Sequence, residues 1–159
     1  MKQPLSLKAR TLRYLAAREH SRAELERKLA PHAAALDPAE LPRVLDELTA
    51  KGFISEQRVA ESVLHRRAAK LGGARVLQEL RAKGLGEQAL ADAAGQLRAT
   101  ELARARAVWA KKFGALPQNP AERVRQTRFL AVRGFAFETV RQVLGAEDCR
   151  DAFSILAGG

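Results

Sequence analysis

Apolar residues recur every three or four positions along most of the chain, which is the spacing of amphipathic helices. Alanine, leucine, arginine and glutamate dominate, and these residue types favour helix. The pattern predicts nine short helices, with apolar stripes at 9–16, 25–29, 41–48, 60–71, 76–80, 89–97, 102–113, 124–130 and 140–144. Each stripe is too short for a helix that is stable alone, so every helix must pack on its neighbours.

Capping residues mark where several of these helices should begin. Ser21 and Glu24 have the spacing of a capping box, and Ser55 is a further candidate N-cap. Asp37 and Asn119 each precede a proline, which is tolerated in a first helical turn because its missing N–H has no partner there.

Three stop signals share one composition: a cation, a glycine and a large apolar residue. A glycine in this position takes the left-handed conformation, and the following apolar residue folds back on the last helical turn. The cation faces the negative end of the helix. The signals are Lys51-Gly52-Phe53, Lys83-Gly84-Leu85 and Arg133-Gly134-Phe135.

The stop signals also reveal an internal repeat. Sliding the chain by 50 residues lays Lys83-Gly84-Leu85 on Arg133-Gly134-Phe135, and a slide of 51 residues aligns 21–29 with 72–80. The repeat predicts an all-α fold of three tandem three-helix units in an elongated, curved array. The units are expected at 1–51, 52–98 and 99–159, and the last includes a C-terminal tail.

Charge points to a polyanionic partner. The chain has 28 Lys and Arg against 18 Asp and Glu, giving a formal charge of +10, and nucleic acid is the first candidate for such a balance. A single Cys149 excludes an internal disulfide and any zinc site built from several cysteines. No apolar leader or membrane-length apolar run is present. We therefore expect a soluble, cytoplasmic protein without membrane contact.

Residues for catalysis or metal binding are not arranged in any recognisable pattern. The three histidines lack paired ligand spacing, and Gly72-Gly73 lacks the strand and the Gly-Lys-Ser/Thr of a phosphate loop. No set of nucleophile, base and orienting residue stands out. The sequence predicts a binding protein, not an enzyme, with no metal and no cofactor.

The order of several short motifs resembles the RecX family. A Gly-Phe-Ile run at 52–54, Arg66-Arg67, a glycine turn at 72–73 and a Glu-Leu-x-x-Lys-Gly run at 79–84 follow one another at the family's spacing, and flanking motifs extend the resemblance over about 9–144. Departures occur: Ser55 and Val59 stand where an acid and an aromatic are usual, Leu71 and Gly73 replace a common aromatic and proline, and 30–35 lacks the expected Lys-Gly. These substitutions affect loop geometry more than function.

The resemblance implies a regulator that acts on the RecA recombinase. Members of the family lie in the groove of the RecA nucleoprotein filament and inhibit RecA ATPase, strand exchange and filament growth. They thereby modulate recombination, DNA repair and the SOS response. For this chain we expect a monomer that binds DNA alone weakly and without sequence preference.

Basic residues of the second and third units are the candidate contacts to RecA or DNA. They are Arg58, Arg66, Arg67, Lys70, Arg75, Lys83, Arg125, Arg128 and Arg133. The structural alternative for each is a solvated helix face or a partner for a helix C-terminus, and at Lys83 and Arg133 this alternative has at least equal weight. Trp109 and Phe113, four residues apart on an apolar stripe, fit a core better than an interaction patch.

Two other functional classes remain open from the residues alone. Short trihelical units with basic helices also fit a helix-turn-helix DNA-binding regulator with no connection to RecA. Against this class, no single helix concentrates base-reading side chains near its start. A scaffold protein with no nucleic-acid partner is the second alternative.

Overall fold

The computed structural model describes residues 3–145, and in this range the chain forms helices and no strand. The helices are α1 (Leu7–Ala17), α2 (Arg22–Ala33), α3 (Glu40–Ala50), α4 (Glu56–Arg67), α5 (Gly73–Ala82), α6 (Glu87–Lys112), α7 (Pro120–Val132) and α8 (Phe137–Leu144). The predicted all-α class is confirmed.

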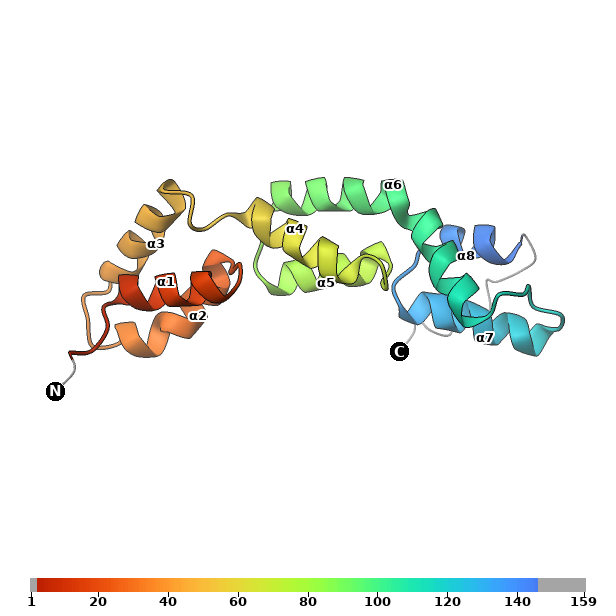
Figure 1. The fold of residues 1–159 in the computed structure, drawn as a ribbon, viewed down its shortest axis with the longest axis horizontal. Helices are drawn as coiled ribbons and strands as arrows, with labels where there is room; N and C mark the ends of the chain where they lie inside the picture. The colour runs from red at the N-terminus through yellow and green to blue at the C-terminus, as the bar shows by residue number, and fades with distance from the viewer. Residues whose placement is uncertain (1–2, 146–159) are drawn as a thin grey trace.

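The helices are arranged as an elongated, curved row of three bundles (Figure 1). Each bundle buries its own set of apolar side chains. Leu25 and Leu45 belong to the first cluster, Val76 and Leu80 to the second, and Leu130 to the third. The predicted array of three-helix units is therefore confirmed. We call these bundles the first unit (α1, α2 and α3), the second unit (α4, α5 and the first half of α6) and the third unit (the second half of α6, α7 and α8).

The prediction of nine helices is wrong at the junction of the second and third units. The stripes at 89–97 and 102–113 lie on one continuous helix, α6, which bends midway (Figure 1). Ala93 and Leu97 pack in the second cluster, whereas Ala105 packs in the third. The segment between them contains helix-forming residues and no proline, so the apolar stripe changes sides without interrupting the helix.

Three of the four predicted N-caps are confirmed. Ser21 and Glu24 form a reciprocal capping box, and Ser55 and Asn119 accept hydrogen bonds from the third residue of their helices. The predicted cap at Asp37 is wrong, because α3 begins at Glu40 after Ala39. The Asp37 carboxylate instead accepts from the Ala39 N–H at 3.0 Å, within the turn that precedes the helix.

The three glycine stop signals have the predicted backbone geometry. Gly52, Gly84 and Gly134 have φ angles of +80°, +77° and +90°. At Gly84 the glycine N–H donates to the Arg81 carbonyl at 2.9 Å, and the Leu85 N–H donates to the Leu80 carbonyl at 3.4 Å. The same pair of bonds forms at the other two sites, as expected of a Schellman motif.

The C-terminus of α7 meets the N-terminus of α5 head to tail. The Gly72 N–H donates to the Arg133 carbonyl at 2.8 Å, and the Ala74 N–H donates to the Gly134 carbonyl at 3.3 Å. The Arg75 guanidinium donates to the Val132 carbonyl at 3.3 Å. Unsatisfied carbonyls at the end of one helix thus pair with unsatisfied N–H groups at the start of another. We call this contact the second joint.

The C-terminus of α5 also meets the N-terminus of α2 head to tail, but here the contacts are made by side chains. The Ser21 hydroxyl donates to the Lys83 carbonyl, and the Lys83 ammonium lies 3.0 Å from the Glu24 carboxylate. Arg18 also pairs with Glu24, at 3.0 Å. We call this contact the first joint. The 50-residue sequence repeat therefore reflects two equivalent joints that align α7, α5 and α2 in one direction.

Glu24 is the buried charge at the centre of the first joint. Burial disfavours its charged form, but hydrogen bonds from Arg18, the Ser21 backbone and Lys83 outweigh that cost and lower the pKa of Glu24 to about 2. The neighbouring His20 is also buried, and its burial lowers its pKa. The joint is thus assembled from a carboxylate, two cations and a buried imidazole.

Glycine substitutions separate the cost of backbone conformation from the cost of the close helix approach. A Cβ added at Gly84 would lie 2.6 Å from the Ala23 Cβ, and one at Gly134 would lie 2.6 Å from the Arg75 backbone nitrogen. Gly84→Ala and Gly134→Ala should each cost about 2–4 kcal/mol, since left-handed strain adds to overpacking. Thermal and urea unfolding measure both.

The control for these variants is Gly52→Ala. Gly52 has the same left-handed backbone, but its added Cβ has nothing within 4 Å. Its cost should be only about 1–2 kcal/mol. Equal losses at all three glycines would show that the joints are not closely packed.

Glu24→Gln should make the free energy of unfolding less dependent on pH in the acid range. Unfolded Glu24 titrates near its ordinary pKa of 4.5, whereas in the folded state its pKa is about 2. The unfolded chain therefore binds the proton first as the pH falls. The stability supplied by Glu24 is full above pH 4.5 and disappears toward pH 2.

At neutral pH the substitution should remove on the order of 2–3 kcal/mol of unfolding free energy. Glu47→Gln is the matched control, because Lys51 and Lys8 also lower the pKa of Glu47 to about 2, but on an exposed surface. Exposed ion pairs contribute little, so this variant should change stability much less. Urea unfolding at a series of pH values tests both, and identical curves for the two variants would contradict a central role for Glu24.

Candidate partner-binding surface

The C-terminal end of α4 carries three of the predicted binding residues. Arg67 is ion-paired with Glu79 of α5, at 2.8 Å. Arg66 is exposed and donates only to the Ser62 carbonyl of its own helix, at 3.3 Å. Lys70 is exposed, and its ammonium has no hydrogen-bond or ion-pair partner within residues 3–145. Arg66 and Lys70 are therefore open to an external anion, whereas Arg67 connects two helices.

Lys83 and Arg75 lie in the first and second joints. The Lys83 side chain is only 22% exposed, and its ammonium faces Glu24. Arg75 is exposed, but its guanidinium donates to the Val132 carbonyl at the end of α7. At these two residues the structural alternative to a binding role therefore has physical support: each cation contacts a neighbouring helix of the same chain.

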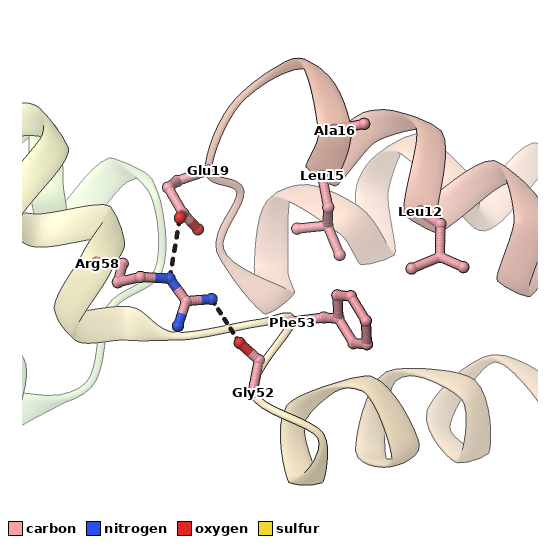
Figure 2. A pocket seen from close by; sticks show the side chains of 7 residues that line it. All are labelled: Leu12, Leu15, Ala16, Glu19, Gly52, Phe53 and Arg58. Carbon is pink, nitrogen blue, oxygen red and sulfur yellow. Dashed lines mark hydrogen bonds and ion pairs between the residues drawn. The ribbon is translucent and has the colours of Figure 1, made fainter.

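Arg58 holds the connection between the first and second units. Its guanidinium donates to the Glu19 carboxylate at 2.9 Å and to the Gly52 carbonyl at 2.6 Å (Figure 2). Beside it is a hollow of about 310 Å³, lined by α1 side chains that include Leu12 and Leu15. Phe53 lies opposite these leucines and is 48% exposed (Figure 2).

The three predicted residues of the third unit lie on or next to α7. Arg133 stacks on the Phe129 ring, with its guanidinium carbon 3.6 Å from the ring centroid. Arg125 lies over the Phe113 ring at 5.6 Å. Arg128 is exposed and has no partner in the described part of the chain. The arginines therefore differ: one is fixed on an aromatic ring, one is close to a ring, and one is free.

Trp109 and Phe113 do not share one environment. Trp109 packs against the third core cluster, and its indole N–H donates to Gln126 at 2.8 Å. The Phe113 ring meets the Phe129 ring edge-on, with centroids 5.1 Å apart. Phe113 is partly exposed and is not among the side chains packed on that cluster. The expected core position thus holds for Trp109 only.

Two charged residues that sequence reasoning missed hold the second and third units together. Arg104 donates to the carbonyls of Ala68 and Leu71, at 2.8 and 2.5 Å, and burial lowers its pKa. Glu101 accepts from the Gly73 N–H at 3.0 Å and from the Thr139 hydroxyl at 2.8 Å. No sequence signal separates these residues from ordinary charges on a helix surface.

Several exposed cations are also without a partner among the described residues, and most of them were not singled out from the sequence. Apart from Lys70 and Arg128 they are Arg13, Arg43, Arg81, Arg98, Arg106, Lys111 and Lys112. Four of them belong to α6. The unpaired positive charge is thus distributed along the array, with its densest run on α6.

The described residues contain no group of three or more histidine, cysteine or acidic side chains placed to hold a metal ion. Within the same part of the chain, no helix has the length and apolar character needed to cross a bilayer.

Comparison with known proteins gives consistent matches. The sequence profile for "RecX, third three-helix domain" matches residues 99–144. A regulatory protein RecX of Leptothrix cholodnii is 57% identical over 144 residues, covering 91% of this chain and 90% of the relative. A regulatory protein RecX of Ralstonia nicotianae is 51% identical over 147 residues, covering 92% of this chain and 91% of the relative.

Solved structures support the same fold. The crystal structure of RecX from Lactobacillus salivarius matches with a TM-score of 0.74 at 15% identity, over 94% of this chain and 95% of the other. A second crystal structure of a regulatory protein RecX matches with a TM-score of 0.71 at 20% identity, over 87% of this chain and 70% of the other. With relatives more than half identical along nearly the full chain, this protein belongs to the RecX family.

Proposed function

We propose that this protein binds the RecA nucleoprotein filament and inhibits RecA ATPase, strand exchange and filament growth. The observation that carries the proposal is the close similarity, over about nine-tenths of the chain, to proteins named as RecX regulators. In this role the protein modulates recombination, DNA repair and the SOS response. It acts in the cytoplasm as a monomeric binding protein with no catalytic step and no cofactor.

The distribution of charge suits a filament that contains DNA. Free cations extend from Arg13 in α1 to Arg128 in α7, so an extended polyanion could contact the array at several points. Each phosphate contact releases counterions, and binding should therefore weaken steeply with salt. DNA alone would be bound weakly and without sequence preference, because such contacts read no bases.

The contacts of the nine candidate residues support two different roles in this proposal. Arg66, Lys70 and Arg128 have no anionic partner in the described chain and would contact RecA or DNA directly. Arg125, whose guanidinium lies over the Phe113 ring at 5.6 Å, joins them. The remaining five would hold the array in a shape that fits the filament: Arg58, Arg67, Arg75, Lys83 and Arg133.

The helix-turn-helix alternative is less consistent with the helix ends. A recognition helix presents its N-terminal residues to the major groove. The first N–H groups of α5 are bonded to the third unit and to Glu101, and Gly86, which precedes α6, donates to the Glu56 carboxylate at 3.2 Å. Neither helix therefore has a free N-terminus with which to read bases.

Charge reversal at the end of α4 tests the proposed binding residues. The double variant Arg66→Glu and Lys70→Glu should weaken inhibition of RecA ATPase on single-stranded DNA by about ten-fold or more, because it replaces attraction with repulsion. Helix content should not change, because both side chains are exposed and neither pairs with an acid. The measurement is the concentration that halves RecA ATPase, together with a circular dichroism spectrum.

The matched control reverses Arg13 and Arg43, which are also exposed and unpaired among the described residues but belong to the first unit. This variant should inhibit more strongly than the α4 variant. Inhibition lost in the control and kept in the α4 variant would move the binding face to the first unit. If the parent protein leaves RecA ATPase unchanged, the proposed function itself is wrong.

A further inference from the structure

A hollow in the third unit combines aromatic rings with positive charge. It has a volume of about 390 Å³ and is lined by Lys112, Phe113, Arg125 and Phe129. The first two residues come from the end of α6, and the last two come from α7. No acidic side chain lines it. A hollow of this size and charge can accept a ring-sized group that carries a negative charge.

The Phe113 ring is the surface that remains available in this hollow. Arg133 lies 3.6 Å from the centre of the Phe129 ring and so already occupies a face of it. Arg125 is farther from Phe113, at 5.6 Å, and is itself exposed. Because Phe113 meets Phe129 at its edge and is not packed on the core cluster, a planar group could stack on it without disturbing the core.

Further unpaired cations lie next to the lining residues along α6 and α7. Lys111 and Lys112 end α6, and both are exposed without a partner within the described range. Arg128 is one turn along α7 from Arg125 and is equally free. An aromatic platform between ammonium and guanidinium groups is the arrangement by which proteins hold single-stranded nucleic acids: the ring stacks on a base and the cations bind the phosphates.

We propose that this hollow binds one unstacked base of a single-stranded nucleic acid, with Lys111, Lys112 and Arg125 on the adjoining phosphates. An acidic protein surface would satisfy the cations but would make no use of the ring face, so the aromatic residue favours nucleic acid. The inference deepens the proposed function, since it assigns a strand contact to the third unit. It rests on the proposed function only in taking the strand to be part of a RecA nucleoprotein filament.

The test compares two oligonucleotides that carry equal phosphate charge. One is a short oligodeoxythymidylate, and the other has the same length but consists of abasic residues. The full chain is used, and binding is followed through the fluorescence of Trp109, the single tryptophan, which lies one turn before Phe113 on α6. The parent protein should bind the base-containing strand about ten-fold more tightly, the effect expected of one stacked base.

Phe113→Leu should remove this preference and leave affinity for the abasic strand unchanged. The matched control is Phe53→Leu, which alters an exposed phenylalanine of the first unit and should keep the preference. Equal affinity of the parent for both strands, or loss of the preference in both variants, would overturn the inference. So would an acidic peptide that binds the parent with the same dependence on Phe113, because it would assign the hollow to protein.

A second variant keeps the test independent of the stability of Phe113→Leu. Lys112→Gln should weaken the binding of both strands alike. It should also reduce the slope of log affinity against log salt by about the amount that one phosphate contact contributes. An unchanged slope would contradict the assignment of phosphates to this rim. RecA ATPase is measured in parallel to separate the two proposals. Inhibition without base-dependent binding would support the proposed function and overturn the base-binding hollow. Base-dependent binding without inhibition would support the hollow and overturn the proposed function.

Discussion

The structure depends on one kind of contact: the carbonyl end of a helix against the N–H end of a helix in the preceding unit. The contact occurs twice, from α7 to α5 and from α5 to α2. At the second joint it satisfies backbone groups of both helices, and at the first joint it satisfies the Lys83 carbonyl. In both, the positive end of one helix dipole lies against the negative end of the next. These joints act together with the continuous helix α6 and with the contacts of Arg104 and Arg58 to fix how neighbouring units are placed.

The two joints use different chemistry for the same geometry. The second joint is made largely from backbone N–H and carbonyl groups, and the continuous helix α6 spans the same two units. The first joint depends on side chains, with Glu24 between Lys83 and Arg18, and Arg58 bonded to Glu19 nearby. Protonation and salt weaken charged contacts more than backbone hydrogen bonds. The connection to the first unit is therefore the more responsive to solution conditions.

Much of this fold could be predicted from the sequence, because its signals are local. The glycines at 52, 84 and 134 and the caps at Ser21, Ser55 and Asn119 act through backbone geometry that neighbouring residues determine. The continuity of α6 was missed because the apolar stripe moves to another side of the helix, and in the sequence this shift has the same pattern as the end of one helix and the start of another. Arg104 and Glu101 were missed because their partners are 28 to 38 residues away. A charge that contacts distant backbone has no local signature, so the candidate cations could not be divided into structural and free ones from the sequence.

The division of the cations into structural and free ones affects how the array could recognise a polyanion. A flexible chain with the same charge could also bind DNA and release its counterions, but it would lose conformational freedom on binding. Here the joints fix the units before any partner arrives, so free cations such as Lys70 and Arg128 are held at set positions on different units. Several weak phosphate contacts on a preorganised frame add without a new ordering cost for each one. In the proposed function, the paired cations such as Arg58 and Lys83 would contribute to affinity indirectly, by keeping the unpaired cations in place.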